Sequence, residues 1–445
     1  AGTTERLKVT SGGLFVNGSA TALGGGGGGI GEFISTSIAI SSDDSALAND
    51  DGTTNENIAL GYNAGNAITI GSYNFLAGYQ SGHVSNPSNA IGIGFRSLYD
   101  LTSGSQAIGI GKYAGSSITT GDDNIALGQN AIGGAGATTG SYNFGAGYQT
   151  GYSLTTGEYN VLNGYQAGYS LTSGANNVAM GRLALRTATS GSSNTAVGHY
   201  AANSLTTGSG NTAVGQEAMQ WGTGGGYNTA IGFRAGKSVT GTDNTFVGRM
   251  TGYNTSSGSY NLAMGSSSMK WGQTGSYNVA LGTEVFMGTS ANKPTGSYNT
   301  GIGYQTGYNL TTAQYNVLNG YQAGYNLTTG QDNILMGTRA GRGLTTSRWN
   351  IALGVDALGL ATESSVLYGN VAIGKDSLRD VDSGDYNVGI GYGAGENITS
   401  GSSNSCLGYA AGDLLTTGSN NLVLGRFSDP SSATVSNEIT LGDSS

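Results

Sequence analysis

The strongest constraint on the fold is a five-residue motif that recurs through most of the chain. It consists of Asn, an apolar residue, a small residue, a second apolar residue and Gly, as in Asn57–Gly61 and Asn421–Gly425. Counted on the closing glycine, from Gly61 to Gly442, there are 23 copies. Of the 22 spacings, 17 are 17 residues long, two are 16, and three are longer at 19, 21 and 20. So regular a period predicts one structural unit per repeat, stacked as a solenoid.

We number each repeat from its asparagine, so that the anchor glycine is position 5. A helix does not suit a unit such as Asn194–Gly210, which has Gly at position 5, often Gly at position 15, and many β-branched residues. Positions 2–4 alternate like a short strand, and position 12 is commonly Leu, Ile or Val. Positions 3 and 8 are small, which indicates a narrow core. The sequence predicts an all-β fold, a parallel β-roll or β-solenoid of about 23 coils with two short strands per coil.

Four segments are expected along the chain. Residues 1–22 form an N-terminal strand unit, with two strands around the Gly12-Gly13 turn, and residues 23–56 form a Gly-rich linker and cap. Within that cap, residues 38–40 are interpreted as one degenerate coil. Residues 57–442 form the β-roll fibre, and 443–445 are its C-terminal end. A block of nine coils is duplicated, since residues 140–154 return as 296–310 with extra residues just before each copy.

Composition excludes several classes of protein. With 82 Gly but only three Pro, and no glycine at every third residue, the chain is not collagen. A hydrophobic share of 37 % and 26 Tyr argue against a disordered linker. The single cysteine, Cys406, excludes an internal disulfide framework, and only two His are present. We therefore expect no enzyme, no cofactor and no metal site.

Charge and hydropathy bear on the expected partners. The net charge of −9 argues against nucleic acid as a partner, and no apolar run is long enough to insert into a membrane. Both faces of the motif strand look too apolar or too small for solvent. One face is expected to fill the roll, and the other to pack against copies of the chain around an axis, as a parallel homotrimer.

The segment from Gly225 to Gly236, with its Asn-Thr-Ala-Ile-Gly core, resembles the head repeat of trimeric autotransporter adhesins. The resemblance covers about residues 57–442 and implies a left-handed parallel β-roll with three chains to a head. The family repeat is usually about 14 residues long, so the corner between strands must differ here.

The longer form of the repeat, with Tyr-Gln-Ala-Gly-Tyr and Leu-Thr-Thr-Gly, resembles tail fibres of tailed viruses. Residues 5–13 resemble a short strand unit common in such fibres, and residues 436–445 resemble the segment before an endosialidase-type intramolecular chaperone. The resemblance implies that such a chaperone trimerises the fibre and is then cleaved off.

These observations predict a structural and adhesive fibre, a viral tail fibre or appendage that presents multivalent receptor-binding surfaces. A bacterial trimeric adhesin head and a purely structural spacer are the alternatives. The expected partners are further copies of the chain, a host cell-surface glycan or protein, and viral baseplate or appendage proteins. The expected location is the virion or the extracellular surface.

Aromatic residues supply the candidate receptor-binding sites. Tyrosines recur in columns, before the motif asparagine, after the anchor glycine and at position 10, and such columns form ring ladders. The ladders either bind glycans or close coil corners and subunit seams, and the second interpretation is favoured. Tryptophan offers larger platforms for sugar rings, with corner packing as the alternative. The candidates for receptor binding are Trp221, Trp271, Trp349, Tyr148, Tyr165, Tyr304 and Tyr321.

The asparagine and glycine columns of the motif are given structural roles. The asparagines are expected to form an internal amide ladder rather than an array of ligands. The anchor glycines are expected to turn the chain at a coil corner. Representative structural residues are Asn194, Asn211, Asn228, Gly198, Gly215 and Gly232.

Overall fold

A computed structural model describes residues 6–10, 13–17, 38–40, 46–49 and 56–442, except residues 85, 135, 273 and 361–365. The chain divides into two compact units, Ala1–Gln216 and Glu217–Ser445. Within the described ranges every regular element is a β-strand, β1–β26, so the all-β prediction is confirmed.

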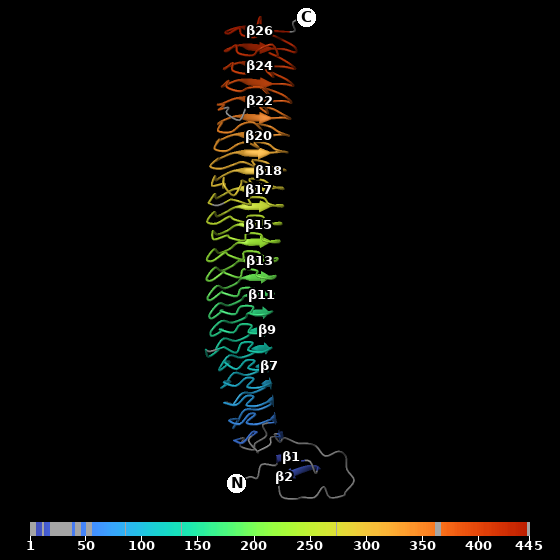
Figure 1. The fold of residues 1–445 in the computed structure, drawn as a ribbon, viewed down its shortest axis with the longest axis vertical. Coiled ribbons are helices and arrows are strands. Elements are labelled where there is room, and N and C mark those ends of the chain that lie inside the picture. The colour runs from blue at the N-terminus through green and yellow to red at the C-terminus, as the bar shows by residue number, and fades with distance from the viewer. Residues whose placement is uncertain are drawn as a thin grey trace. The chain divides into compact units, whose positions relative to one another are not determined.

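The first unit holds an antiparallel pair and a stack of parallel strands (Figure 1). The pair joins β1 (Arg6–Thr10) to β2 (Gly13–Asn17), with Arg6 opposite Asn17, as expected for the N-terminal strand unit. The stack consists of β3 (Ile38–Ile40), β4 (Ile58–Leu60), β5 (Phe75–Ala77), β6 (Ile91–Ile93), β7 (Ile108–Ile110), β8 (Ile125–Leu127), β9 (Phe144–Ala146), β10 (Val161–Asn163), β11 (Val178–Met180), β12 (Thr195–Val197) and β13 (Thr212–Val214). The degenerate coil expected at 38–40 is β3, which pairs in parallel with β4. The expected glycine tether, residues 24–29, lies outside the described residues.

The second unit is a similar stack of three-residue strands. It consists of β14 (Thr229–Ile231), β15 (Thr245–Val247), β16 (Leu262–Met264), β17 (Val279–Leu281), β18 (Thr300–Ile302), β19 (Val317–Asn319), β20 (Ile334–Met336), β21 (Ile351–Leu353), β22 (Val371–Ile373), β23 (Val388–Ile390), β24 (Ser405–Leu407), β25 (Leu422–Leu424) and β26 (Ile439–Leu441). In both units consecutive strands pair in parallel, position for position, as Val161 does with Val178. Each unit is therefore a parallel β-solenoid with the 17-residue period of the sequence.

The prediction of two strands per coil is wrong for the described coils, which have one each. The stretch after the anchor glycine turns instead, because positions 7 and 9 adopt left-handed backbone conformations, as Gln166 (φ 52°) and Gly168 (φ 60°) do. Two such residues within three positions break an extended strand. Backbone hydrogen bonds between coils nevertheless continue there, for example from Thr155 N to Thr172 O at 3.0 Å.

The anchor glycines make close contacts between coils. Gly198 has φ 134°, a region that other residues rarely adopt. A Cβ atom on Gly198 would lie 2.6 Å from the carbonyl oxygen of Gly215, the next anchor. Both the backbone conformation and the stacking distance therefore require glycine at position 5.

Position 3, the middle of each strand, fills the core together with positions 8, 9 and 12. The residue at position 3 is buried in β4 to β25, and its size is matched to that of position 9. A Cβ atom on Gly168, at position 9, would lie only 2.9 Å from a methyl carbon of Leu162, at position 3. Phe286 reverses the arrangement, because it fills position 9 and faces Gly301 at position 3 of the next strand. At these pairs, positions 3 and 9 share one space in the core, and that space holds one large side chain.

The asparagines at position 1 form an amide ladder beside this core, unbroken from Asn124 to Asn211 in the first unit and from Asn228 to Asn421 in the second. Position 1 is alanine at Ala90 and Ala107, and glutamate at Glu438. Asn194 donates through Nδ2 to Oδ1 of Asn177 at 3.1 Å and to the Gly208 carbonyl at 2.9 Å, and its backbone N–H bonds the same Oδ1. Asn211 repeats the contact with Asn194, and Asn244 repeats it with Asn228. These side chains are buried, so their polar atoms are satisfied within the fold.

Candidate binding surfaces

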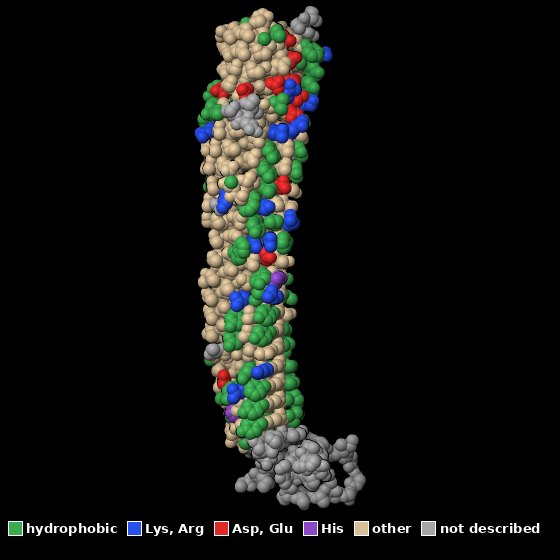
Figure 2. Space-filling model, viewed as in Figure 1, with side chains coloured by type: hydrophobic (Ala, Val, Ile, Leu, Met, Phe, Trp, Pro, Cys, Tyr) green, Lys and Arg blue, Asp and Glu red, His purple; other side chains and the backbone are tan. Residues whose placement is uncertain are grey.

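The outward residues of the strands, positions 2 and 4, form an apolar surface in each unit, which we call the strand face. They are half-buried or exposed, as in β20, where Ile334 is 39 % and Met336 is 40 % exposed. From β4 to β26 no residue at either position is charged, and most are Ile, Leu, Val, Met or Thr. Figure 2 shows hydrophobic side chains gathered in lengthwise stripes on the visible face. Large exposed apolar patches of this kind mark interaction surfaces.

Tyrosine ladders flank the strand face on both sides. After the anchor glycine, Tyr148 stacks on Tyr165 with ring centroids 5.4 Å apart, and Tyr304 stacks on Tyr321 at 5.6 Å. Before the asparagine, four rings stack in consecutive coils at 4.9 to 5.1 Å: Tyr260, Tyr277, Tyr298 and Tyr315. The tyrosine rings of these two predicted columns therefore stack on one another from coil to coil. Their exposed rings can either stack on a ligand or pack against a second chain.

The three tryptophans occupy two different places in the repeat. Trp349 precedes the asparagine Asn350, in the same column as Tyr315, and is 56 % exposed beside the strand face. Its ring lies 6.0 Å from that of Tyr368 in a tilted arrangement. Trp221 and Trp271 are both at position 11, on the turning part of the coil. The structure therefore separates Trp349 from the other two by position within the coil.

Trp221 is held by charged side chains that are themselves paired. The Lys237 ammonium lies 4.0 Å from the Trp221 ring centroid, a cation–π distance, and 2.6 Å from Glu217 Oε2. Arg234 also pairs with Glu217, through Nε at 2.9 Å. The Lys237 side chain is only 5 % exposed, whereas Trp221 is half exposed. Hydrogen bonding from Lys237 and from Arg234 lowers the pKa of Glu217.

Trp271 has a comparable setting three coils further on. Its ring meets Tyr253 edge to face with centroids 6.3 Å apart, and the Lys270 ammonium lies 5.4 Å from the Trp271 centroid. Tyr253 in turn lies 5.6 Å from the Lys237 ammonium. Trp221 and Trp271 are thus linked through Lys237 and Tyr253.

Sequence reasoning missed the cations and the carboxylate that hold these rings. The available signal was the spacing of Glu217 and Arg234, which occupy position 7 in consecutive repeats, 17 residues apart. Residues at the same position in consecutive coils are neighbours in a solenoid, just as residues at i and i+4 are in a helix. A search for opposite charges at that spacing finds the pair.

A second cluster of charged side chains forms ion pairs among its own members. Arg379 pairs with Asp380 at 2.8 Å and also contacts Glu396. Burial raises the pKa of Glu396, and the Arg379 charge opposes that shift. Within the described ranges, no group of three or more His, Cys, Asp or Glu side chains is arranged to hold a metal ion.

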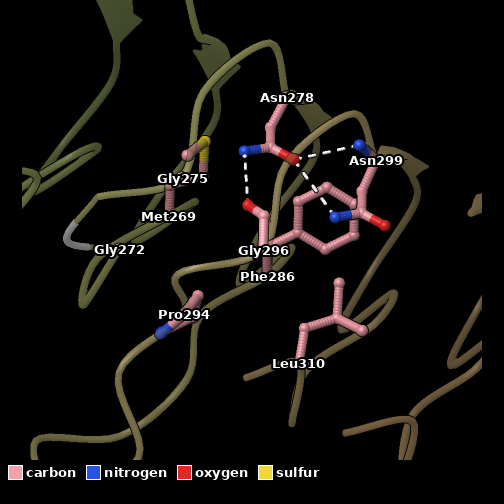
Figure 3. Close-up of a pocket in the computed structure, with 9 residues that line it drawn as sticks. All are labelled: Met269, Gly272, Gly275, Asn278, Phe286, Pro294, Gly296, Asn299 and Leu310. Carbon is pink, nitrogen blue, oxygen red and sulfur yellow. Dashed lines mark hydrogen bonds between the residues drawn. The ribbon is translucent and has the colours of Figure 1, made fainter. Parts of the chain in front are cut away.

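A small internal cavity lies beside the duplicated bulge that contains Pro294 (Figure 3). Met269, Phe286 and Leu310 line it, and Asn278 and Asn299 join the amide ladder at its edge through bonds of 3.0 and 3.2 Å. Its volume of about 10 Å³ is close to the least that one water needs. Position 12 is Gly272 here instead of the usual large apolar residue, which explains the gap. The cavity is too small for an organic ligand.

The described part of the chain contains no helix long and apolar enough to cross a membrane. No protein-family model matches the chain, and neither does any curated protein.

Proposed function

We propose that the chain is a structural and adhesive fibre, of the kind that tailed viruses carry as a tail fibre or appendage, in which three parallel copies associate through their strand faces. The observation that carries the proposal is the uncharged strand face: 23 consecutive strands, β4 to β26, place only neutral side chains outward. If the strand face contacted only water, we would expect charged side chains among its outward residues.

The energetics favour association of strand faces. A coil this narrow cannot bury its outward residues itself, since position 3 already fills the interior. Covering the exposed part of one Ile or Met side chain stabilises the complex by on the order of 0.5–1 kcal/mol. Association costs about 4–15 kcal/mol in lost freedom, so one or two dozen such side chains per chain outweigh it. Tyr148, Tyr165, Tyr304 and Tyr321 would close the seams at the edge of this interface.

Adhesion follows from repetition along three chains. The charged and polar positions 7, 10 and 11 lie away from the strand face in the repeat, and they remain open to a host glycan or protein when the strand faces are covered. Weak contacts at these positions add together because the three chains are joined. Attachment to a virion would then be made by baseplate or appendage proteins at one end.

The oligomeric state is tested by light scattering after size-exclusion chromatography of the whole chain. We expect three times the chain mass of 44.6 kDa. The variant Ile108→Asp/Ile110→Asp/Ile334→Asp/Met336→Asp should dissociate at lower urea concentration, because it places charges within the interface. The matched control, Ser153→Asp/Ser170→Asp/Asn309→Asp/Asn326→Asp, adds the same four charges at position 11, two in each unit, and should not. A monomer at all concentrations, or equal effects of the two variants, would contradict the proposal.

Immunogold electron microscopy with an antibody against residues 57–442 tests the location. Gold on virion tails or capsid appendages is the expected result. Gold on cell envelopes would instead identify a surface adhesin.

A further inference from the structure

Four consecutive coils of the second unit carry Trp221, Ser238, Asn254 and Trp271 at position 11, and Lys237, Tyr253 and Lys270 at position 10. We call these seven residues the tryptophan column. We propose that the tryptophan column binds an acidic oligosaccharide, whose sugar rings stack on the two tryptophans and whose carboxylate or sulfate groups pair with Lys270 and Arg234. This inference rests on the proposed adhesive function and names the chemistry of its ligand.

The first argument is that the Trp221 ring is held in place before any ligand binds. The Lys237 ammonium fixes the Trp221 ring from a distance of 4.0 Å and is itself held by Glu217 at 2.6 Å. The backbone N–H of Trp221 donates to the Lys237 carbonyl at 2.8 Å. Half of Trp221 stays exposed, so a rigid aromatic face is available at little entropic cost.

The second argument is the spacing of the two tryptophan rings, which would serve as the platforms on which sugar rings stack. Trp221 and Trp271 are three coils apart, and three strand spacings of about 4.8 Å give roughly 14 Å between them. A single sugar ring cannot reach both, whereas a short oligosaccharide lying along the column can. Between the platforms, Ser238 and Asn254 are half-buried and offer a hydroxyl and an amide, which suit sugar hydroxyl groups.

The third argument is charge, which selects an acidic sugar over a neutral one. Residues 217–271 carry four cations, Arg234, Lys237, Arg249 and Lys270, against two carboxylates, although the whole chain has a net charge of −9. Lys237 is already paired with Glu217. Within the described ranges no ion pair joins Lys270 to a carboxylate, and its ammonium lies 5.4 Å from the centroid of the Trp271 ring. Arg234 uses Nε and Nη2 for Glu217, which leaves Nη1 for an anion.

The test measures binding of three probes to the whole chain by isothermal titration calorimetry and tryptophan fluorescence. The probes are tetragalacturonate (carboxylated), a heparin tetrasaccharide (sulfated) and maltotetraose (neutral). We expect at least one acidic probe to bind about tenfold or more tighter than maltotetraose, and its affinity to fall with added salt. Whichever acidic probe binds identifies the anionic group.

Variants separate stacking from charge. Trp221→Ala and Trp271→Ala should each weaken acidic-probe binding by about tenfold, and Trp221→Phe should retain most of it. Lys270→Gln should weaken the acidic probes and leave maltotetraose unchanged, whereas Lys112→Gln, the same charge change in the other unit, should alter neither. Thermal unfolding of each variant checks that it is folded.

Equal affinity for acidic and neutral probes would overturn the charge assignment. Absence of binding by all three, or full binding by the folded Trp221→Ala and Trp271→Ala variants, would overturn the site. The chain's mass and its adhesion to host cells are measured on the same samples. Trimers that adhere without binding any probe would refute the column and leave the proposed fibre standing.

Discussion

The Lys237 ammonium lies between two partners of opposite character, 2.6 Å from Glu217 Oε2 and 4.0 Å from the centroid of the Trp221 ring. Because the Lys237 side chain is 5 % exposed, water compensates its charge only weakly. The carboxylate of Glu217 is therefore required to keep a cation at this place in the fold.

The first prediction concerns that pair. Glu217→Gln leaves a buried ammonium without its carboxylate and should destabilise the second unit by about 2–4 kcal/mol. Adding Lys237→Met to the same chain removes the unpaired ammonium and should restore part of the lost stability. Urea unfolding followed by circular dichroism measures both, and a double variant less stable than Glu217→Gln alone would contradict the interpretation.

The amide ladder makes a second prediction. Asn194→Ala removes the acceptor of the Asn211 backbone N–H and one of the acceptors of Asn211 Nδ2, which also donates to the Ser209 carbonyl, and so leaves a buried N–H donor unsatisfied. A cost of about 2–4 kcal/mol is expected, because buried donors lose water without gaining a partner. Asn397→Ala is the control, since Asn397 bonds Asp413 at an exposed site without a left-handed backbone, and its loss should cost about 0.5 kcal/mol or less. Equal shifts in the unfolding midpoint would refute a structural role for the ladder.

The cavity beside Pro294 makes a third prediction. A Cβ on Gly272 would meet its nearest neighbour at 3.4 Å, an ordinary contact, and the backbone there is not left-handed. Gly272→Ala should therefore be neutral or stabilising by up to about 1 kcal/mol. Gly275→Ala, three residues away, would place its Cβ 2.1 Å from the Gly296 carbonyl oxygen and should be strongly destabilising. Thermal melts of the two variants should move in different directions or by very different amounts.

Cys406 provides a fourth prediction, on reactivity. Its thiol is buried at position 3 of β24, and burial raises its pKa to about 12. At pH 8 almost all of this thiol is protonated in the folded protein, so it should react with Ellman's reagent far more slowly than after unfolding in guanidinium chloride. Rapid labelling of the native chain would show that the coil around β24 opens readily.

Sequence periodicity was sufficient for the repeat and for the strand at positions 2–4. These features depend on contacts that every coil repeats, so the pattern appears in the sequence many times. The periodicity left open which face of that strand fills the roll, and the burial of position 3 decides this. The second strand was predicted wrongly because apolar residues at positions 8 and 12 satisfy a turning chain as well as an extended one. What decides between them is the left-handed backbone at positions 7 and 9, which residues such as Gln166 and Leu185 adopt without any glycine signal.

The candidate site was predictable only in part. The shared position of Trp221 and Trp271 follows from the spacing, and their placement apart from Trp349 follows from the repeat. The support from Lys237 and Glu217 was missed because it joins different positions, 10, 11 and 7, of neighbouring coils. Such diagonal contacts depend on how far each coil is offset from the next, which the period alone does not determine.

Electron cryomicroscopy of the whole chain tests whether its strand faces associate as a trimer. We expect three parallel chains, with the strand faces of β4–β26 turned toward one another and the tryptophan column facing solvent. A single chain, or an assembly in which Trp221 and Trp271 are buried between copies while Ile334 and Met336 face water, would contradict this expectation.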